Sequence, residues 1–311
     1  GAKGRVTSLG EGESGDILLD VTPFYGEAGG QVGDHGVLEH ADGCFEVVDT
    51  QKPADGVILH RGRVVRGRIT EGARLRATVD KTRRRATMRH HTGTHLLNAA
   101  LRRLVAADVK QAGSWVGPER LRFDFTWMEA VPAETLRRIE ELVNSWILDD
   151  RPVTTSEMAM KDVAGTDIVA VFDEKYGEIV RVVSVEGVSR ELCGGTHVRR
   201  TGELGLFRIE SEGSVASGIR RIEALCGRAA WAAARADRDR MEALSRLLSA
   251  SPAEVADRVA ALLSECRDLQ KAVRAAEAAA VQSRATELLE HPCQVGDTTL
   301  IHGYVGEASP E

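Results

Sequence analysis

The sequence predicts an α+β protein with a β-rich beginning, a mixed middle and a helical end. Three observations carry this prediction. Short strand-like runs separated by glycines extend to about residue 79, strand and helix patterns mix over residues 80–226, and a glycine-poor stretch rich in alanine, arginine, leucine and glutamate follows. At 311 residues the chain is long for a single core, so we expect two or three domains.

The composition limits which partners and which cellular compartment we expect for this protein. Hydrophobic residues make up 42% of the chain, and the formal net charge of −6 argues against indiscriminate binding to polyanions, so any nucleic-acid contact must use local basic patches. The five cysteines are scattered and odd in number, which favours a reducing cytoplasm over a disulfide framework. Since no apolar run is long enough to cross a bilayer and no leader pattern opens the chain, we expect a cytoplasmic protein without a membrane partner.

The first predicted part, residues 1–79, is a small β-barrel domain. It contains short β-like runs separated by glycines and no helical period. Short strands at close spacing with turn residues between them are typical of such barrels. The runs lie at residues 16–21, 36–38, 45–48, 56–59 and 74–79.

A glycine-rich stretch, residues 22–34, interrupts these strands. Taken alone, it is most simply a hairpin loop whose glycines adopt positive φ angles. The alternative is a loop whose bare backbone approaches a ligand closely.

A helix is predicted over residues 80–107. Asp80 or Thr82 can cap it, and apolar residues at helical spacing form one stripe along it. Its basic beginning, residues 81–89, is most simply a solvated face. Beside a metal site it could instead hold the phosphates of a nucleic acid, with Arg84 as the candidate residue.

The second predicted part, residues 80–226, contains two pairs of potential metal ligands. His91 and His95 are four residues apart, so on a helix they lie on the same face. Cys193 and His197 are also four apart, and the two glycines between them allow a turn around the same ion. Zinc accepts imidazole and thiolate in tetrahedral geometry. The spacing therefore predicts one zinc site and leaves open whether the ion is structural or reactive.

The rest of this part alternates strands with a helix, which completes a helix-flanked antiparallel sheet. The strands are predicted near residues 121–126, 181–185, 205–210 and 219–225, and the helix follows Pro132.

The third predicted part, residues 227–291, is a long helical arm. A serine, a proline and a glutamate within residues 251–254 predict a helix start. Apolar residues then repeat in steps of four and three from Val255 to Ala280, a heptad seam typical of an antiparallel helical hairpin or a coiled coil. The arm either forms a homodimer or folds back on itself. Residues 292–311 are expected to begin a truncated C-terminal domain, with a strand at 298–305 that lacks its partners.

Six short motifs follow one another along the first 225 residues. They are Thr22-Pro23-Phe24-Tyr25 with Gly29-Gly30-Gln31, the His-Thr-x-Thr-His at 91–95, Gln111 to Ser114, Arg122-Phe123-Asp124-Phe125, Cys193-Gly194-Gly195-Thr196-His197, and Gly218 to Glu223. In this order they resemble the editing portion of bacterial alanyl-tRNA synthetases. The arm and the residues after 291 resemble that family's linker and the start of its C-terminal domain.

The resemblance implies an activity. In that family this region hydrolyses seryl-tRNA and glycyl-tRNA wrongly made for the alanine tRNA, so we expect an aminoacyl-ester hydrolase that binds the acceptor end of tRNA(Ala). No aminoacylation motif or ATP site is visible, so we do not expect this chain to charge tRNA.

The resemblance also implies roles for single residues. The implied zinc ligands are His91, His95, Cys193 and His197. Gln111 matches a pocket residue beside the metal, the Gly29-Gly30 loop with Thr22 matches a segment that senses the serine hydroxyl, and Arg220 matches an arginine near the tRNA end. We take Gln111 and Thr22 as the groups that reward the serine hydroxyl, because size alone cannot exclude the smaller alanine.

The chain departs from the family pattern at two positions, with His90 in place of asparagine and Gly93 in place of alanine. We expect His90 to point away from the metal, since neighbours on a helix diverge by about 100°. Gly93 should loosen the helix or let a ligand approach it closely. No Ser-His-Asp arrangement is evident, so metal-assisted or substrate-assisted hydrolysis is expected.

Two other functions stay open at this point. One is a freestanding editing factor that acts in trans with the same chemistry. The other is a zinc-stabilised tRNA-binding module without hydrolytic activity, because an ion closed by four protein ligands is typical of structural sites.

Overall fold

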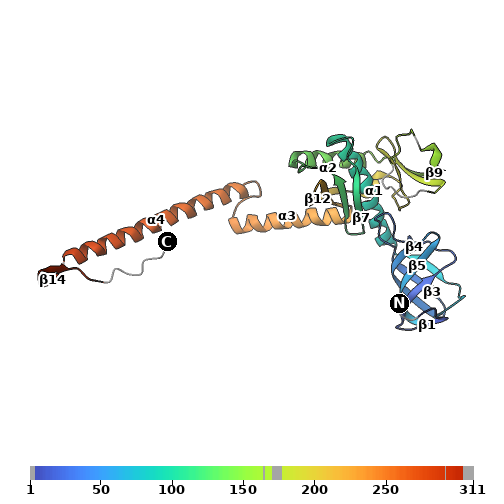
Figure 1. Cartoon of the computed structure of the whole chain (residues 1–311), viewed down its shortest axis with the longest axis horizontal. Coiled ribbons are helices and arrows are strands. Elements are labelled where there is room, and N and C mark those ends of the chain that lie inside the picture. The colour runs from blue at the N-terminus through green and yellow to red at the C-terminus, as the bar shows by residue number, and fades with distance from the viewer. Residues whose placement is uncertain (1–3, 164, 170–176, 291, 304–311) are drawn as a thin grey trace. The chain divides into compact units, whose positions relative to one another are not determined.

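The computed structural model describes residues 4–163, 165–169, 177–290 and 292–303. The chain divides into two compact units, one up to Ala234 and one from Arg235 onward. The first unit contains three antiparallel sheets and most of the helical packing, and Figure 1 shows its elements. The α+β class predicted from the sequence is therefore confirmed.

The N-terminal strands form an open six-stranded antiparallel sheet, not the predicted barrel. The order is β1-β5-β4-β3-β6, and β2 also pairs with β5. Among the described residues no pairing joins β6 back to β1 or β2: both of these strands pair with β5, and β6 pairs with β3. The strands are β1 (Ser8–Gly10), β2 (Ser14–Leu18), β3 (Gly36–His40), β4 (Gly43–Ala54), β5 (Val57–Thr70) and β6 (Arg76–Val79).

A four-stranded sheet with order β12-β13-β8-β7 forms the main core with two helices. Alternation in β8 buries Leu121, Phe123 and Phe125 on one face, against Leu97 and Ile139 of the helices. The elements are α1 (Lys81–Leu104), β7 (Gln111–Val116), β8 (Leu121–Thr126), α2 (Ala133–Leu148), β12 (Phe207–Ala216) and β13 (Ile219–Cys226).

A three-stranded sheet, β11-β10-β9, carries the second pair of potential ligands at its end. Its small core contains Val180, Val182 and Leu192. The elements are β9 (Val153–Ala159), β10 (Ile179–Val185), β11 (Ser189–Leu192) and the short 3₁₀ turns Met160–Asp162 and Thr201–Leu204.

Helix α1 begins as the sequence predicts. The Asp80 side chain accepts hydrogen bonds from the backbone N–H groups of Thr82 (2.9 Å) and Arg83 (3.0 Å), which satisfies two of the free donors of the first turn. The helix ends at Leu104, before the predicted residue 107. The middle turns of the helix, which hold the two histidines, are buried.

The two departures from the family pattern meet at one place. His90 points away from the histidine pair, as expected, and its Nε2 accepts a hydrogen bond from the backbone N–H of Cys226 at 3.0 Å. A Cβ on Gly93 would lie 2.7 Å from Cys226 Sγ. The close neighbour at this glycine is therefore a buried side chain of β13 and not the expected ligand.

Replacing Gly93 by alanine tests this packing. Alanine in a helix interior normally adds about 1 kcal/mol of stability. Here we expect a loss of about 1–2 kcal/mol, because the buried Cys226 must move. In a Cys226→Ala background we expect Gly93→Ala to stabilise the protein instead. Urea unfolding of the single and double variants measures the coupling, and purely additive effects would contradict this explanation.

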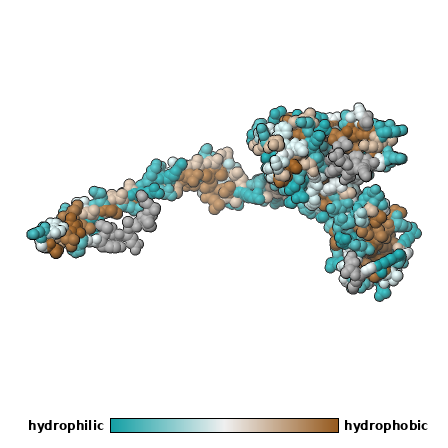
Figure 2. Space-filling view, viewed as in Figure 1, coloured by the Kyte–Doolittle hydropathy of each residue, from teal (hydrophilic) through white to brown (hydrophobic). Residues whose placement is uncertain are grey.

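The helical arm consists of α3 (Arg228–Leu248), which spans the boundary between the units, and α4 (Val255–Glu290). Glu254 bonds back to the Ser251 backbone N–H at 3.0 Å, as the helix-start pattern predicts. The heptad seam of α4 is open, however: Val259, Leu269 and Val273 are 41%, 59% and 55% exposed, and Figure 2 shows hydrophobic residues at the surface of this unit. Within the described part of the arm only Val255 of α4 is buried, so the seam does not pack against a second helix of this chain as a hairpin would. A coiled coil with a second copy stays a prediction.

The C-terminal residues form a small hairpin of β14 (Cys293–Val295) and β15 (Thr298–Leu300). The predicted strand at 298–305 therefore has a partner after all, and its last two residues lie outside the described residues. Within the described residues, no helix combines the length and the apolarity that a membrane span requires.

Candidate metal centre

Four side chains from distant parts of the sequence meet in the first unit. Two come from the middle of α1, and two come from the loop that follows β11. Their ligand atoms all lie within 4.8 Å of one another. They are the four residues predicted from spacing: His91, His95, Cys193 and His197.

The Cys193 thiol lies between imidazole nitrogens. Its Sγ is 3.4 Å from His91 Nε2 and 3.3 Å from His197 Nε2. The His95 ring lies against the other two imidazoles, with centroid distances of 5.4 Å to His91 and 4.7 Å to His197. Three imidazoles and a thiolate form a donor set that zinc accepts. The group could therefore hold a metal ion, and its donors are consistent with zinc.

The second ring nitrogen of each histidine of the cluster faces a polar side chain, although Nδ1 of His95 forms no hydrogen bond. Nδ1 of His91 lies 2.6 Å from Gln31 Oε1, that of His95 lies 3.4 Å from Glu191 Oε2, and that of His197 lies 3.1 Å from Thr92 Oγ1. Metal-binding histidines characteristically engage their second nitrogen in this way, which holds the ring and its tautomer. The cluster therefore has the surroundings of a metal site as well as the ligands.

Protonation in the cluster is shifted by burial and by neighbouring charge. Burial alone would raise the pKa of the Cys193 thiol, but His91 and hydrogen bonds from His197 outweigh it, so this pKa falls well below its usual value. Burial, with the charge of His91, lowers the pKa of His197 to about 3. A thiolate and a neutral imidazole are the forms that bind metals, so both shifts favour ligation. Burial alone would lower the pKa of His95, but the charges of Glu191 and Cys193 raise it to about 9, so this ring must lose a proton when it binds a metal.

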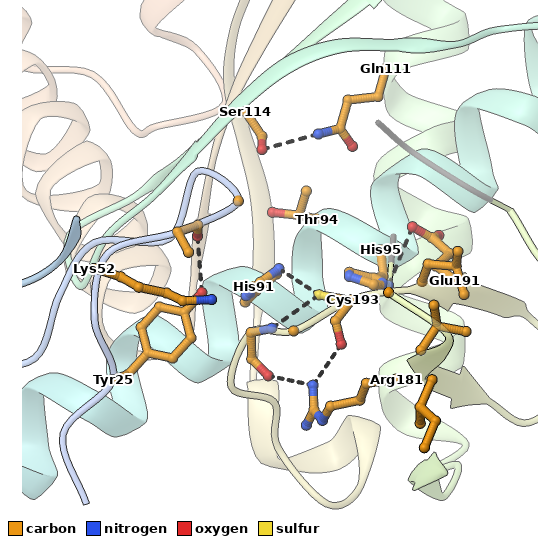
Figure 3. A pocket seen from close by; sticks show the side chains of 18 of the residues that line it. Tyr25, Lys52, His91, Thr94, His95, Gln111, Ser114, Arg181, Glu191 and Cys193 are labelled. Carbon is orange, nitrogen blue, oxygen red and sulfur yellow. Dashed lines mark hydrogen bonds and ion pairs between the residues drawn. The ribbon is translucent and has the colours of Figure 1, made fainter. Parts of the chain in front are cut away.

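A cavity of about 410 Å³ opens onto this cluster. Figure 3 shows Gln111 and Ser114 at the top of the view, Tyr25 and Lys52 at its left, and Cys193 to the right of His91. The side chains of the lining are mostly polar, which suits a polar ligand. They include Tyr25, Lys52, His91, Thr94, His95, Gln111, Ser114, Arg181, Glu191 and Cys193.

Gln111 and Gly29 of the predicted site lie in this lining. Gln111 Nε2 donates to Ser114 Oγ at 3.1 Å. Gly29 and Gly30 have φ angles of 57° and 81°, as expected of a loop that needs positive φ. A Cβ on Gly30 would also lie 2.5 Å from the Ser114 carbonyl oxygen, so this glycine allows the loop to approach β7.

Thr22 lies outside the lining of this cavity. Its Oγ1 is 2.7 Å from His60 Nε2 and accepts the backbone N–H of Phe24 at 3.1 Å. The structure therefore places this hydroxyl within the N-terminal sheet region and not beside Gln111.

The two arginines predicted to contact tRNA are engaged elsewhere in the protein. Arg84 Nε donates to the Asp34 carboxylate at 2.7 Å and 2.9 Å, and its Nη2 donates to the Pro23 carbonyl at 2.9 Å. Arg220 Nη2 donates to Glu212 Oε2 at 2.8 Å. Arg84 thereby ties helix α1 to the glycine-rich loop.

Several residues of the site were not singled out from the sequence. Arg181 Nη1 donates to the carbonyl oxygens of Cys193 and Gly195, both at 2.7 Å, and so holds the ligand turn. Thr94 lines the cavity one residue before His95, and its position within the His-Thr-x-Thr-His motif was a signal for it. Arg181 belongs to a strand with no motif, so nothing local indicated its role.

Two family models match parts of this chain. The model described as tRNA synthetases class II (A) matches residues 2–83. The model described as Threonyl and Alanyl tRNA synthetase second additional domain matches residues 180–223, which include the turn with Cys193 and His197.

Curated relatives match most of the chain. It is 48% identical to the alanine–tRNA ligase of Thermus thermophilus over 280 residues, which cover 88% of this chain and 32% of the relative. The corresponding enzyme of Desulfosudis oleivorans is 48% identical over 282 residues, covering 90% and 32%. That of Pelotomaculum thermopropionicum is 42% identical over 299 residues, covering 96% and 34%. The chain spans about a third of the length of these relatives and belongs to the alanyl-tRNA synthetase family.

Proposed function

We propose that this chain proofreads tRNA by hydrolysing the ester of seryl-tRNA(Ala) and glycyl-tRNA(Ala). The observation that carries the proposal is the polar cavity that opens directly onto the four-residue cluster. An aminoacyl ester placed there would have its carbonyl and amine beside the cluster. Membership of the alanyl-tRNA synthetase family supports an editing role. We propose that the chain performs this role in the cytoplasm, as part of an alanyl-tRNA synthetase.

The cluster is proposed to bind zinc through His91, His95, Cys193 and His197. A bound zinc ion would supply a positive charge that polarises an ester carbonyl or holds the substrate amine. The protein's own task is then to position the ester and to discriminate the amino acid. Among the described residues of the lining no carboxylate stands free as a general base, because Glu191 faces His95 and Asn98 and Asp55 pairs with Lys52.

We propose that Gln111, Ser114 and Thr94 form the wall that recognises the serine hydroxyl. All three line the cavity, and Figure 3 shows them on the same side of it. Thr94 Oγ1 donates to the His90 carbonyl at 2.9 Å, so its lone pairs remain to accept a substrate hydroxyl. A wall that can hydrogen-bond a hydroxyl favours serine over alanine, because alanine has no hydroxyl to bond with it.

This proposal gives different roles to the other residues that the sequence predicted to contact the substrate or the tRNA. Thr22 holds the entry of the glycine-rich loop through His60, and the backbone of Gly29 meets the substrate. Arg84 and Arg220 each already hold a carboxylate, so they are less suited to bind tRNA phosphates than to keep the loop and the sheet in place.

A deacylation assay with a metal analysis tests this function. We expect the chain to release serine from seryl-tRNA(Ala) and to leave alanyl-tRNA(Ala) intact. Cys193→Ala should lower zinc content and deacylation together, whereas the exposed Cys266→Ala should change neither. Intact seryl ester in the presence of bound zinc would overturn the hydrolase proposal and favour a zinc-stabilised tRNA-binding module.

A further inference from the structure

Gln31 is a polar residue of the first unit that the proposed hydrolysis does not use. It ends the glycine-rich loop, and its side chain is fully buried, at 0% exposure. A buried amide needs partners for its oxygen and its nitrogen. Both partners belong to the metal cluster or to the turn that carries half of it, namely His91 and Thr196.

The orientation of the Gln31 amide follows from one backbone group. The N–H of Thr196 lies 2.9 Å from the amide atom assigned as Oε1, and a backbone N–H can only donate. That atom must therefore be oxygen. The other amide atom, Nε2, then donates to Thr196 Oγ1 at 2.9 Å, so both ends of the amide are satisfied.

The same oxygen determines the tautomer of His91. His91 Nδ1 lies 2.6 Å from Gln31 Oε1, and an amide oxygen only accepts, so Nδ1 carries the proton. Nε2 of the neutral ring then has a bare lone pair. This lone pair lies on the side of Cys193 Sγ, 3.4 Å away, where a metal ion would sit.

The loop that carries Gln31 is itself held on both sides. Val32 N–H donates to Val116 O at 3.0 Å, and Val116 N–H donates to Gly30 O at 2.8 Å. Gln31 and Ala28 also exchange backbone hydrogen bonds at 3.0 and 3.3 Å. The backbone of Gln31 is therefore held against β7, and the hydrogen bonds with Thr196 hold the amide beside His91.

We propose that Gln31 is the positioning residue that holds His91 in the Nδ1–H tautomer and directs its Nε2 into the metal site. The N-terminal sheet thereby completes a metal site whose ligands all lie in later parts of the chain. The inference rests on the metal site of the proposed function but does not require hydrolysis. Orienting partners of this kind change metal affinity by about 10–100-fold when removed.

Three variants distinguish the orienting role of Gln31 from a purely structural link between the glycine-rich loop and the turn that carries Cys193 and His197. Gln31→Leu removes the acceptor of His91. Gln31→Glu keeps an oxygen for both N–H groups, and the Thr196 hydroxyl can turn to donate to it. Thr196→Val removes the contacts of the Thr196 hydroxyl with Gln31 Nε2 and Oε1 and leaves the His91 contact in place.

Zinc affinity, measured by competition with a chelator, and the visible spectrum of the Co²⁺-loaded chain are the readouts. We expect Gln31→Leu to weaken zinc binding about 10–100-fold and to alter the Co²⁺ spectrum, while Gln31→Glu and Thr196→Val stay close to wild type. Unchanged affinity and spectrum in Gln31→Leu would overturn the proposal. So would an equal loss in Gln31→Leu and Thr196→Val.

A measurement on the wild-type chain keeps the proposal testable even if Gln31→Leu does not fold. Nitrogen-15 NMR of the histidine rings in the metal-free protein should show His91 protonated at Nδ1, and a His91 ring protonated at Nε2 would overturn the proposal. If zinc affinity depends on Gln31 but seryl-tRNA stays intact, the proposed hydrolysis fails and this inference stands.

Discussion

Gly195→Ala is expected to abolish tight metal binding, whereas Gly194→Ala is expected to preserve it. A Cβ on Gly195 would overlap the His91 ring at Cε1 and Nδ1, and it would lie 2.9 Å from Gln31 Oε1. The backbone cannot retreat easily, because Arg181 holds the Gly195 carbonyl at 2.7 Å. A Cβ on Gly194 would meet nothing within 4 Å. We therefore expect Gly194 to tolerate a side chain and its neighbour Gly195 not to tolerate one.

The pair of variants is measured by zinc content after dialysis against a weak chelator. We expect a loss of more than about 100-fold in zinc affinity for Gly195→Ala, since both a ligand and its orienting partner are displaced. Circular dichroism of the metal-free chains controls for global unfolding. Full zinc content in Gly195→Ala would show that His91 is not a ligand or that the turn adapts freely.

Arg84→Gln is expected to destabilise the first unit by about 2–4 kcal/mol, because it leaves a buried carboxylate without its cation. Asp34 is only 5% exposed, and its carboxylate accepts hydrogen bonds from the Arg84 guanidinium and from the Tyr25 backbone N–H at 2.6 Å. Arg85→Gln, one residue further along α1 with an exposed side chain, is the matched control. We expect that control to change stability by less than about 0.5 kcal/mol.

The cause of this loss, a buried carboxylate without its cation, can be tested by a second substitution at Asp34. Asp34→Asn in the Arg84→Gln background removes the unpaired charge, so we expect it to recover part of the lost stability. Urea unfolding followed by circular dichroism measures all variants. If Arg84→Gln and Arg85→Gln behave alike, the pair with Asp34 is not a structural tie, and Arg84 would again be a candidate for contact with tRNA.

The ligand set was predictable because each half of it is local. A spacing of four on a helix brings His91 and His95 to one face, and two glycines in a short loop give Cys193 and His197 a common turn. The alternation around Phe123 and Phe125 likewise predicted a strand with one buried face, and β8 has this pattern. These patterns depend only on residues that are close together in the sequence, so they can be recognised without knowing which elements pack together.

Predictions that depended on distant neighbours failed. The barrel did not close because β1 and β2 both pair with β5, and no local pattern shows which strand a sheet edge will select. The hairpin did not form although the heptad seam of α4 is regular, since a seam indicates a buried face but not its partner. The role of Thr22, which was grouped with Gln111 by resemblance, stays a prediction, and its hydroxyl is bonded to His60.

The sequence by itself determined the α+β class, the start of α1 and the identity of the four potential metal ligands, since these depend on periodicity, capping and spacing along the chain. Only the tertiary structure decided which groups orient the ligands and which glycines make room for them. Gln31 meets His91 across 60 residues, and Gly195 lies against the same ring from a third segment. Such contacts arise from the packing of separate elements, and no spacing along the chain encodes them.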